Sequence, residues 1–338
     1  MSKIYRIEYS HKITEEDQMR TFVEFVRYAT LAPSGHNTQP WKFSLKKDCI
    51  RIFPDFTRRL PVVDPDNREL YISLGCALEN LVIAAKYAGY DPEVEYFPAG
   101  EPDECLLVTL KHSNVIGDNN LFQAIPKRHT NRREYNKQQI PAADLNKIES
   151  VPIENGVTSL VLTEPGAIEQ IIDLVREGNR IQMNNDVFMD EITSWIRFSD
   201  SEEELHLDGL TSRAMGRSPA PGWLGRMFMR IFVSAKSQSK TDEKNMRSSS
   251  ALMVIISVKN DKKSWIDVGR SFERIALTLT TLNIENAHLN QPCEVPQLKS
   301  QLQQNLALGS AHPQLLLRLG YAEPLPRSPR RPHQQVLI

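Results

Sequence analysis

Apolar residues recur at helical spacing along some stretches of the chain and in short β-rich runs along others. The helical spacing predicts helices over about residues 15–31, 68–88, 142–150, 167–183, 187–198 and 264–282. The short runs predict strands at residues 42–45, 50–53, 94–97, 105–110, 158–162, 251–258 and 314–320. Residues 199–250 are polar and interrupted by prolines, so we expect an irregular segment there. Helices and strands in this order predict an α+β fold.

Two of the long predicted helices resemble each other. The segment from Gly75 aligns with the segment from Gly269 at a constant offset of 194 residues, and Glu79 and Glu273 are in register. Chance similarity between two amphipathic helices is the simple alternative. The matching strands downstream favour two copies of one module, which would imitate a homodimer with the two helices packed across a pseudo-twofold axis.

The loop between the first helix and the first strand reads Ala-Pro-Ser-Gly-His-Asn-Thr-Gln-Pro-Trp, residues 32–41. Pro33 disfavours helical geometry in the residue before it, and Gly35 permits a close approach of the backbone. The loop has two interpretations: an ordinary connector rich in turn residues, or a wall of small polar groups that faces a flat ligand. His36 could contact that ligand, although a loop histidine more often makes local hydrogen bonds.

A second candidate motif, Arg-His-Thr-Asn-Arg-Arg-Glu-Tyr, occupies residues 128–135, and a basic segment, Pro-Arg-Ser-Pro-Arg-Arg, occupies residues 326–331. Guanidinium groups bind phosphate oxygens in a bidentate manner. The basic segment is either a disordered tail or a functional one, and the strand expected just before it favours function. No equivalent of the first loop appears in the second half of the chain, and no equivalent of the arginine motif appears near the first helix.

Together these motifs resemble the nitroreductase family, and the duplicated helix points to its Acg-like branch, in which two nitroreductase-type halves are fused. The resemblance implies a nitroreductase-like pseudo-dimer with mixed or antiparallel sheets flanking long central helices. Half one would span residues 1–118 and half two residues 119–338, with a lid insertion at about 199–250. Each half contributes one partner motif, so the chain would hold one FMN site at the seam rather than two.

The resemblance also assigns expected roles around FMN. Pro33, Ser34, Gly35 and Asn37 would line the ring and the ribityl chain. Half two and the tail would supply the remaining contacts: Arg128, Arg327 and Arg330 to the phosphate, Thr130 to ribityl or phosphate oxygens, and Arg132 to the pyrimidine edge. His288 and Asn290 occupy the place where the family usually carries Pro-x-Glu-Gly near the reactive edge of the ring, and this chain departs from that pattern.

Composition narrows the classes of partner. The 338 residues include 40% hydrophobic and 25% charged residues with a formal net charge of −1, which argues against nucleic-acid and membrane-surface binding. The amino-terminal residues lack an apolar signal region. Four separated cysteines and histidines without ligand spacing predict free thiols in the cytoplasm and no metal. We expect the chain to form a monomeric pseudo-dimer. Whether two such molecules associate further as a homodimer is left open.

Two functions follow from these expectations. The first is an NAD(P)H-dependent FMN oxidoreductase with ping-pong turnover, whose acceptor is a nitroaromatic, a quinone or a similar small molecule. The flavin would carry the chemistry, so no catalytic residue is expected. The second is an FMN-binding or sequestering protein with little turnover, in which residues 199–250 cover the flavin. Within them, residues 223–232 are amphipathic and basic; they would form a lid helix packed on the protein or, less expectedly, touch a membrane.

Overall fold

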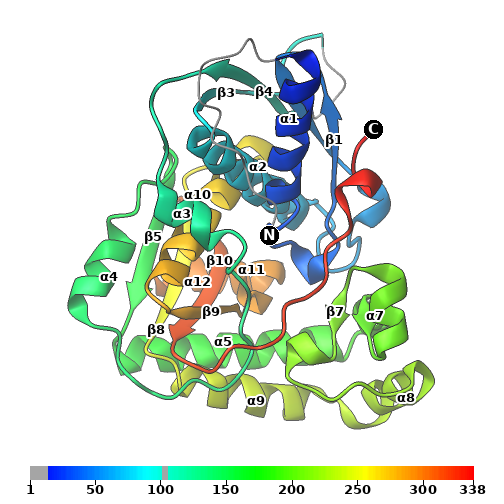
Figure 1. The fold of residues 1–338 in the computed structure, drawn as a ribbon. Helices are drawn as coiled ribbons and strands as arrows, with labels where there is room; N and C mark the ends of the chain where they lie inside the picture. The colour runs from blue at the N-terminus through cyan, green and yellow to red at the C-terminus, as the bar shows by residue number, and fades with distance from the viewer. Residues whose placement is uncertain (1–13, 101–105) are drawn as a thin grey trace.

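The computed structural model describes residues 14–100 and 106–338. These residues form two four-stranded antiparallel sheets on either side of two long central helices, as Figure 1 shows. The elements of the first half are α1 (Glu15–Ala29), η1 (Gly35–Asn37), β1 (Trp41–Leu45), β2 (Cys49–Pro54), η2 (Phe56–Arg58), α2 (Arg68–Tyr87), β3 (Tyr90–Tyr96) and β4 (Leu106–His112). Their sheet has the order β1-β2-β4-β3, and the predicted α+β class is confirmed.

The second half begins with α3 and carries the other sheet, whose order is β5-β8-β10-β9. Its elements are α3 (Asn119–Ala124), α4 (Ala142–Glu149), β5 (Val157–Leu162), α5 (Pro165–Met183), α6 (Asp186–Ser194), β6 (Ile196–Arg197), α7 (Asp200–His206), β7 (Leu210–Thr211), η3 (Arg213–Met215), α8 (Gly222–Phe232), α9 (Ala235–Arg247), β8 (Ala251–Ser257), α10 (Lys262–Thr281), β9 (Glu285–His288), α11 (Gln291–Glu294), α12 (Pro296–Asn305), β10 (His312–Gly320) and η4 (His333–Gln335).

The first helix forms where its sequence signals predict. Thr14 Oγ1 accepts a hydrogen bond from the Asp17 backbone N–H at 3.1 Å, and Asp17 Oδ2 accepts one from the Thr14 N–H, which completes a capping box. The helix buries one face, made by Phe22, Phe25, Val26 and Ala29. Burial of this face fixes α1 against α2, so the loop that follows α1 is held over the amino-terminal part of α2.

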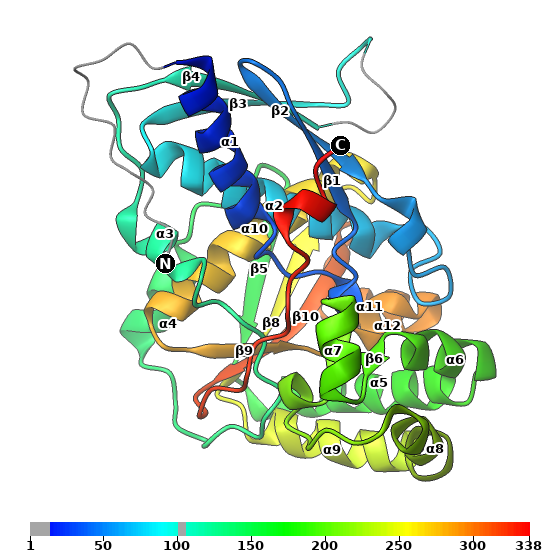
Figure 2. The ribbon, with the colours of Figure 1, turned by 45° about the vertical axis from the view of Figure 1, so that its right-hand side comes forward.

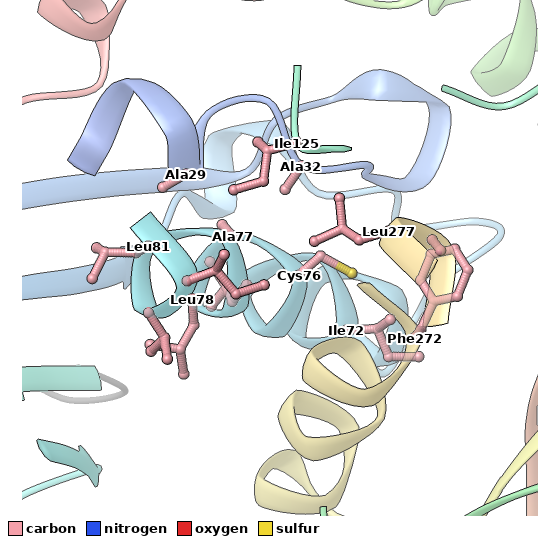
Figure 3. Close-up of a cluster of buried hydrophobic side chains, with 14 of the residues drawn as sticks. Ala29, Ala32, Ile72, Cys76, Ala77, Leu78, Leu81, Ile125, Phe272 and Leu277 are labelled. Carbon is pink, nitrogen blue, oxygen red and sulfur yellow. The ribbon is translucent and has the colours of Figure 1, made fainter. Parts of the chain in front are cut away.

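The two central helices, α2 and α10, pack at a reciprocal glycine contact. A Cβ on Gly75 would lie 2.1 Å from the carbonyl oxygen of Ile266, and a Cβ on Gly269 would lie 2.0 Å from that of Ile72. Both pairs keep the offset of 194 residues seen in the sequence. Figure 3 shows Ile72 of α2 beside Phe272 of α10. The aligned glycines therefore allow two backbones to touch across a local pseudo-twofold relation.

One of these helices passes a length and composition test for a membrane span. Residues 68–87, which form α2, have a mean hydropathy of 1.2 in their most apolar window, but 89% of that window is buried inside the protein. It is surrounded by α1, α3 and α10 rather than exposed to its environment. The apolar character of α2 is thus that of a core helix.

Residues 187–250 differ from the expectation. The helix expected over 187–198 ends at Ser194, because Ile196 and Arg197 pair in parallel with Leu210 and Thr211. Residues 199–250 are largely helical rather than irregular, since they contain α7, α8 and α9. The helix α9 was missed because its sequence is polar, and it is recognisable only by the capping box at Ser234. The sequence pattern also predicts no element at α3, β9, α11 or α12, all of which the structure contains.

The carboxyl-terminal segment returns to the first half. After β10 the chain crosses the molecule, and Leu337 forms a parallel bridge with Phe43 at the free edge of β1 (Figure 2). The Phe43 N–H donates to the Val336 carbonyl at 2.7 Å, and the Ile338 N–H donates to the Phe43 carbonyl at 2.9 Å. The basic tail is therefore held at both ends, which opposes the alternative of a disordered tail.

Candidate functional site

Two adjoining cavities lie where the first half, the second half and the tail meet. The smaller has a volume of about 90 Å³ and the larger about 390 Å³. All eleven residues proposed from the sequence line one or both of them. The smaller cavity takes Asn37, Arg128, Arg327 and Arg330, the larger takes Gly35, His288 and Asn290, and both are lined by Pro33, Ser34, Thr130 and Arg132.

The loop after α1 holds an unusual backbone conformation. His36, Asn37 and Gln39 all have positive φ, at 48°, 55° and 53°. Residues other than glycine rarely adopt this region, and such strain concentrates at functional sites. Ser34 Oγ accepts a hydrogen bond from the Gln39 N–H at 2.9 Å, which closes the turn. Pro33, Ser34 and Gly35 are thereby presented to the cavities.

Asn37 lines the smaller cavity, but its amide is used within the protein. Its Nδ2 donates to the carbonyls of Gly209 at 3.0 Å and Pro329 at 3.2 Å, and its Oδ1 accepts from Arg330 Nη1 at 2.9 Å. Gln39 acts in parallel, since its Nε2 donates to the Leu207 carbonyl at 2.9 Å and its Oε1 accepts from the Arg331 N–H. The sequence predicts that Asn37 contacts the ligand. It does not predict these internal hydrogen bonds, because the partners of Asn37 lie far away in the chain.

Four guanidinium groups surround the smaller cavity. Arg128 is buried and lies 3.3 Å from the buried Glu273 carboxylate, yet its Nε and Nη1 have no hydrogen-bond partner among the described residues. Arg330 Nε is also without a hydrogen-bond partner there. Burial beside Arg128 lowers the pKa of Arg330 to about 9. Buried cations that gather at one cavity and leave donors unused form a site suited to a multiply charged anion.

Arg132 and Arg327 complete this group. In the part of the chain that the structure describes, neither side chain makes a hydrogen bond or an ion pair. Burial and the neighbouring Arg318 lower the pKa of Arg132. Arg132 borders both cavities, so its charge is available to a ligand that extends from one into the other.

The aligned glutamates have different surroundings. Glu273 lies beside Arg128, one of the residues that line the smaller cavity, and burial raises the pKa of Glu273 to about 7 while Arg128 opposes the rise. Glu79 instead pairs with Arg270 at 3.0 Å and Arg274 at 2.7 Å, and both of these also contact Glu154. Glu154 lies between α4 and β5, as the candidate loop lies between α1 and β1. An ion-pair cluster thus surrounds Glu79, whereas Glu273 pairs with an arginine of the smaller cavity.

The larger cavity has a polar side and an apolar side. His36 and His288 line it beside Arg132, and burial lowers their pKa values to about 4 and about 3, so both imidazoles are neutral near pH 7. Polar groups of the opposite wall come from Asn179, Gln182, Gln238, Asp242, Gln291 and Glu294. Apolar groups come from Met183, Phe188, Ile192, Met215, Met229 and Val233. Most of these belong to residues 186–247, which therefore cover the cavity.

Asn290 is a cavity residue whose amide is already engaged. Its Nδ2 donates to Glu69 Oε1 at 3.1 Å, and its Oδ1 accepts from the Leu316 N–H at 2.9 Å. Glu69 and Ser73, which line the same wall from α2, were not identified from the sequence. The only sequence feature that points to these two residues is their position on the turns of α2 nearest the loop. No group of three or more histidine, cysteine or acidic side chains that could hold a metal occurs among the described residues.

Comparison with known proteins gives relatives along nearly the whole chain. A Mycobacterium tuberculosis protein named "Putative NAD(P)H nitroreductase Rv3131" is 27% identical over 320 residues, covering 91% of this chain and 88% of its own length. The protein named "Putative NAD(P)H nitroreductase acg" from the same organism is 24% identical over 326 residues, covering 92% and 93%. The chain is similar to the Acg-like nitroreductases. The resemblance expected from its loop and arginine motifs is confirmed.

Two further comparisons concern family models and solved structures. No family model matches the chain. A solved structure of iodotyrosine deiodinase bound to FMN and 3-iodo-L-tyrosine aligns with 62% of this chain and 95% of its own, at 15% identity and a TM-score of 0.42. That superposition is loose, whereas the similarity to the Acg-like relatives is continuous along the sequence.

Proposed function

We propose that this protein is a cytoplasmic, FMN-dependent oxidoreductase that takes reducing equivalents from NAD(P)H and delivers them to a small acceptor such as a nitroaromatic or a quinone. The observation that supports it most is the cluster of four guanidinium groups at one end of two joined cavities, with unused donors on buried arginines. The names of the curated relatives agree with this activity. Cys76 and Cys293 are buried and form no disulfide among the described residues, which agrees with a reducing compartment.

The residues present fit FMN. Arg128 and Arg330, with Arg327, would hold the phosphate in the smaller cavity, where donors without partners need an anion. Thr130 has no internal hydrogen bond among the described residues and would bond ribityl oxygens. Pro33, Ser34 and Gly35 would support one side of the ring. When bound, FMN supplies the hydride-transfer chemistry that no side chain offers.

The remaining residues set the conditions for that chemistry. Arg132, which spans both cavities, would stabilise the negative charge that a reduced flavin carries at its pyrimidine edge. Neutral His36 and His288 keep the wall polar without adding charge. Because NAD(P)H and the acceptor would use the one large cavity in turn, we expect ping-pong kinetics.

Binding of FMN and of riboflavin tests the proposal at the phosphate end. Arg128→Met should weaken FMN binding about ten- to a hundred-fold, because it removes a charge-assisted hydrogen bond, and should leave riboflavin binding nearly unchanged. Arg133→Met is the matched control, since Arg133 is the exposed neighbour of Arg132 and lines neither cavity. If the purified protein binds no flavin, or if Arg128→Met affects both flavins equally, the proposed phosphate site is wrong.

A second function, sequestration of FMN with little turnover, is favoured by one observation. Residues 186–247 cover the larger cavity and are fastened to the first half of the chain through Asp208, which pairs with Arg58 of η2 and, within the cover, with Arg197. The two functions differ in anaerobic bleaching by NADPH or NADH. An oxidoreductase should bleach and then reoxidise with an acceptor. A sequestering protein should bleach only after Asp208→Asn loosens the cover.

A further inference from the structure

One exposed face of α8 is apolar along the whole length of the helix. Trp223 is 70% exposed, Phe228 50% and Ile231 63%, and Leu224, Met227 and Phe232 are exposed beside them. Their positions repeat at intervals of four residues, so they share one face of the helix. In Figures 1 and 2 the helix lies at the periphery of the molecule. Only the opposite side, at Gly225 and Met229, is buried.

The orientation of this face is fixed by close packing on the inner side. Gly225 lies so near the ring of Phe198 that a Cβ there would come within 2.2 Å of it. Met229 and Val233 line the larger cavity, so α8 covers the site with one side and points its apolar face outward. The expected lid helix therefore exists, but it packs on the protein along a narrow strip only.

We propose that this face is a docking surface for a lipid bilayer that carries anionic headgroups. Residues 209–241 contain six basic residues and no acidic one. Arg226 pairs with Glu202 and Arg213 with Asp200, whereas Arg230, Lys236 and Lys240 have no ion-pair partner among the described residues. Large apolar and aromatic side chains flanked by basic ones are typical of helices that lie in the bilayer interface. This proposal does not depend on FMN.

A second copy of the chain suits the surface less well. A twofold dimer brings the same patch of each copy together. Arg230 would then approach its own counterpart, with no unpaired acid on α8 to compensate. An anionic bilayer instead supplies the opposite charge. The formal net charge of −1, from which no membrane partner was expected, averages over the chain and hides this local excess.

The acidic helix α7 limits the strength of the attraction. Glu203 and Glu204 of α7 have no ion-pair partner among the described residues, and α7 contacts α8 through the pair of Glu202 with Arg226. A single helix of eleven residues also inserts only a small apolar area. We therefore expect reversible, salt-sensitive binding rather than permanent anchoring.

Co-sedimentation of the full-length protein with vesicles tests the proposal. Binding should be clear with 70% phosphatidylcholine and 30% phosphatidylserine, and at least five-fold weaker with phosphatidylcholine alone. The double variant Trp223→Ser and Ile231→Ser should reduce binding about ten-fold or more, with an unchanged thermal midpoint because both side chains are exposed. Val115→Ser is the matched control, because Val115 is 76% exposed in a different part of the chain.

Charge variants separate the electrostatic component of vesicle binding from the apolar component. Arg230→Gln should weaken binding about five-fold at low salt, the equivalent of one basic residue at an anionic surface, and Glu203→Gln should strengthen it. Absence of vesicle binding, or equal binding by the serine variant, overturns the proposal. So does concentration-dependent dimerisation in light scattering that Trp223→Ser and Ile231→Ser abolish, since the face would then bind a second copy.

Discussion

The side-chain oxygen of Asn37 accepts a hydrogen bond from Arg330 Nη1 at 2.9 Å across 293 positions of the chain. The same amide donates to the carbonyls of Gly209 and Pro329. One buried side chain thus joins the candidate loop, the covering insertion and the tail. Arg330 is in turn one of the four cations at the smaller cavity, so the loop and the cation cluster are positioned by a common contact.

Replacement of this amide should loosen the site as a whole. We expect Asn37→Ala to lower the free energy of unfolding by about 2–3 kcal/mol, because it removes three hydrogen bonds and leaves buried groups without partners. FMN should also dissociate faster. Chemical denaturation and flavin fluorescence measure the two effects. Asn114→Ala, at an exposed asparagine, should change neither, and an unaltered Asn37→Ala protein would contradict the prediction.

The reciprocal glycines of α2 and α10 should not tolerate a side chain. A methyl group at Gly75 or Gly269 would meet a backbone carbonyl at about 2 Å, so the helices must separate. Each alanine variant should lose about 3 kcal/mol or more of stability. Gly166→Ala is the control, because a Cβ there meets nothing within 4 Å. Thermal unfolding of the three variants gives the comparison, and equal midpoints would show that the close approach is wrong.

The stability of the protein should depend on pH through His288. Burial, with Arg132 and Arg128 nearby, lowers the pKa of His288 to about 3. The unfolded chain takes up this proton near pH 6.5 and the folded chain does not until about pH 3, so stability is lost as the pH falls through this range. Relative to the His288→Gln variant, the unsubstituted protein should lose about 2 kcal/mol of its free energy of unfolding between pH 7 and pH 5.

Denaturation at several pH values gives the difference between the two proteins. His206→Gln, at an exposed histidine, should follow the unsubstituted protein. Parallel curves for His288→Gln and the unsubstituted protein would mean that His288 is protonated as readily when folded as when unfolded.

Arg318 should act by positioning Arg132. Its Nη2 donates to the carbonyls of Asn131 at 3.2 Å and Arg133 at 2.7 Å, which flank Arg132, and its guanidinium lies 4.0 Å from the Tyr135 ring centre. Arg318→Met should weaken FMN binding about ten-fold when Arg132 is present and much less in Arg132→Met. A double-mutant cycle on the dissociation constant tests this coupling. Additive effects would assign Arg318 a structural role only.

Much of the site was accessible from the sequence because its signals are local. Helix caps, the Pro33–Gly35 turn and the arginine motif each occupy a few consecutive residues, and their chemistry can be read without neighbours. The aligned helices added one long-range relation, since Gly75 and Gly269 carry the same spacing to their contacts. That relation predicts two halves around a shared seam.

Other features depend on partners that no local pattern reveals. The polar helix α9 has little apolar periodicity, so its burial against α5 could not be anticipated. The bonds of Asn37 reach Gly209 and Pro329, and the position of Arg318 follows from the register of β10. Such contacts are decided by the assembled fold, which is why the partners of Asn37, the position of Arg318 and the cavity residues Glu69 and Ser73 could not be predicted from the sequence.

The pairing of residues 336–338 with β1 has a consequence for the order of folding. Phe43 pairs with Val336 and Ile338, which lie in the far half of the chain. The first sheet can form from contacts between nearby residues, but its open edge and the cation-lined cavity beside it are completed only when this distant segment docks. Contacts between residues so far apart in the chain form slowly, so we expect the candidate site to be completed after the sheet.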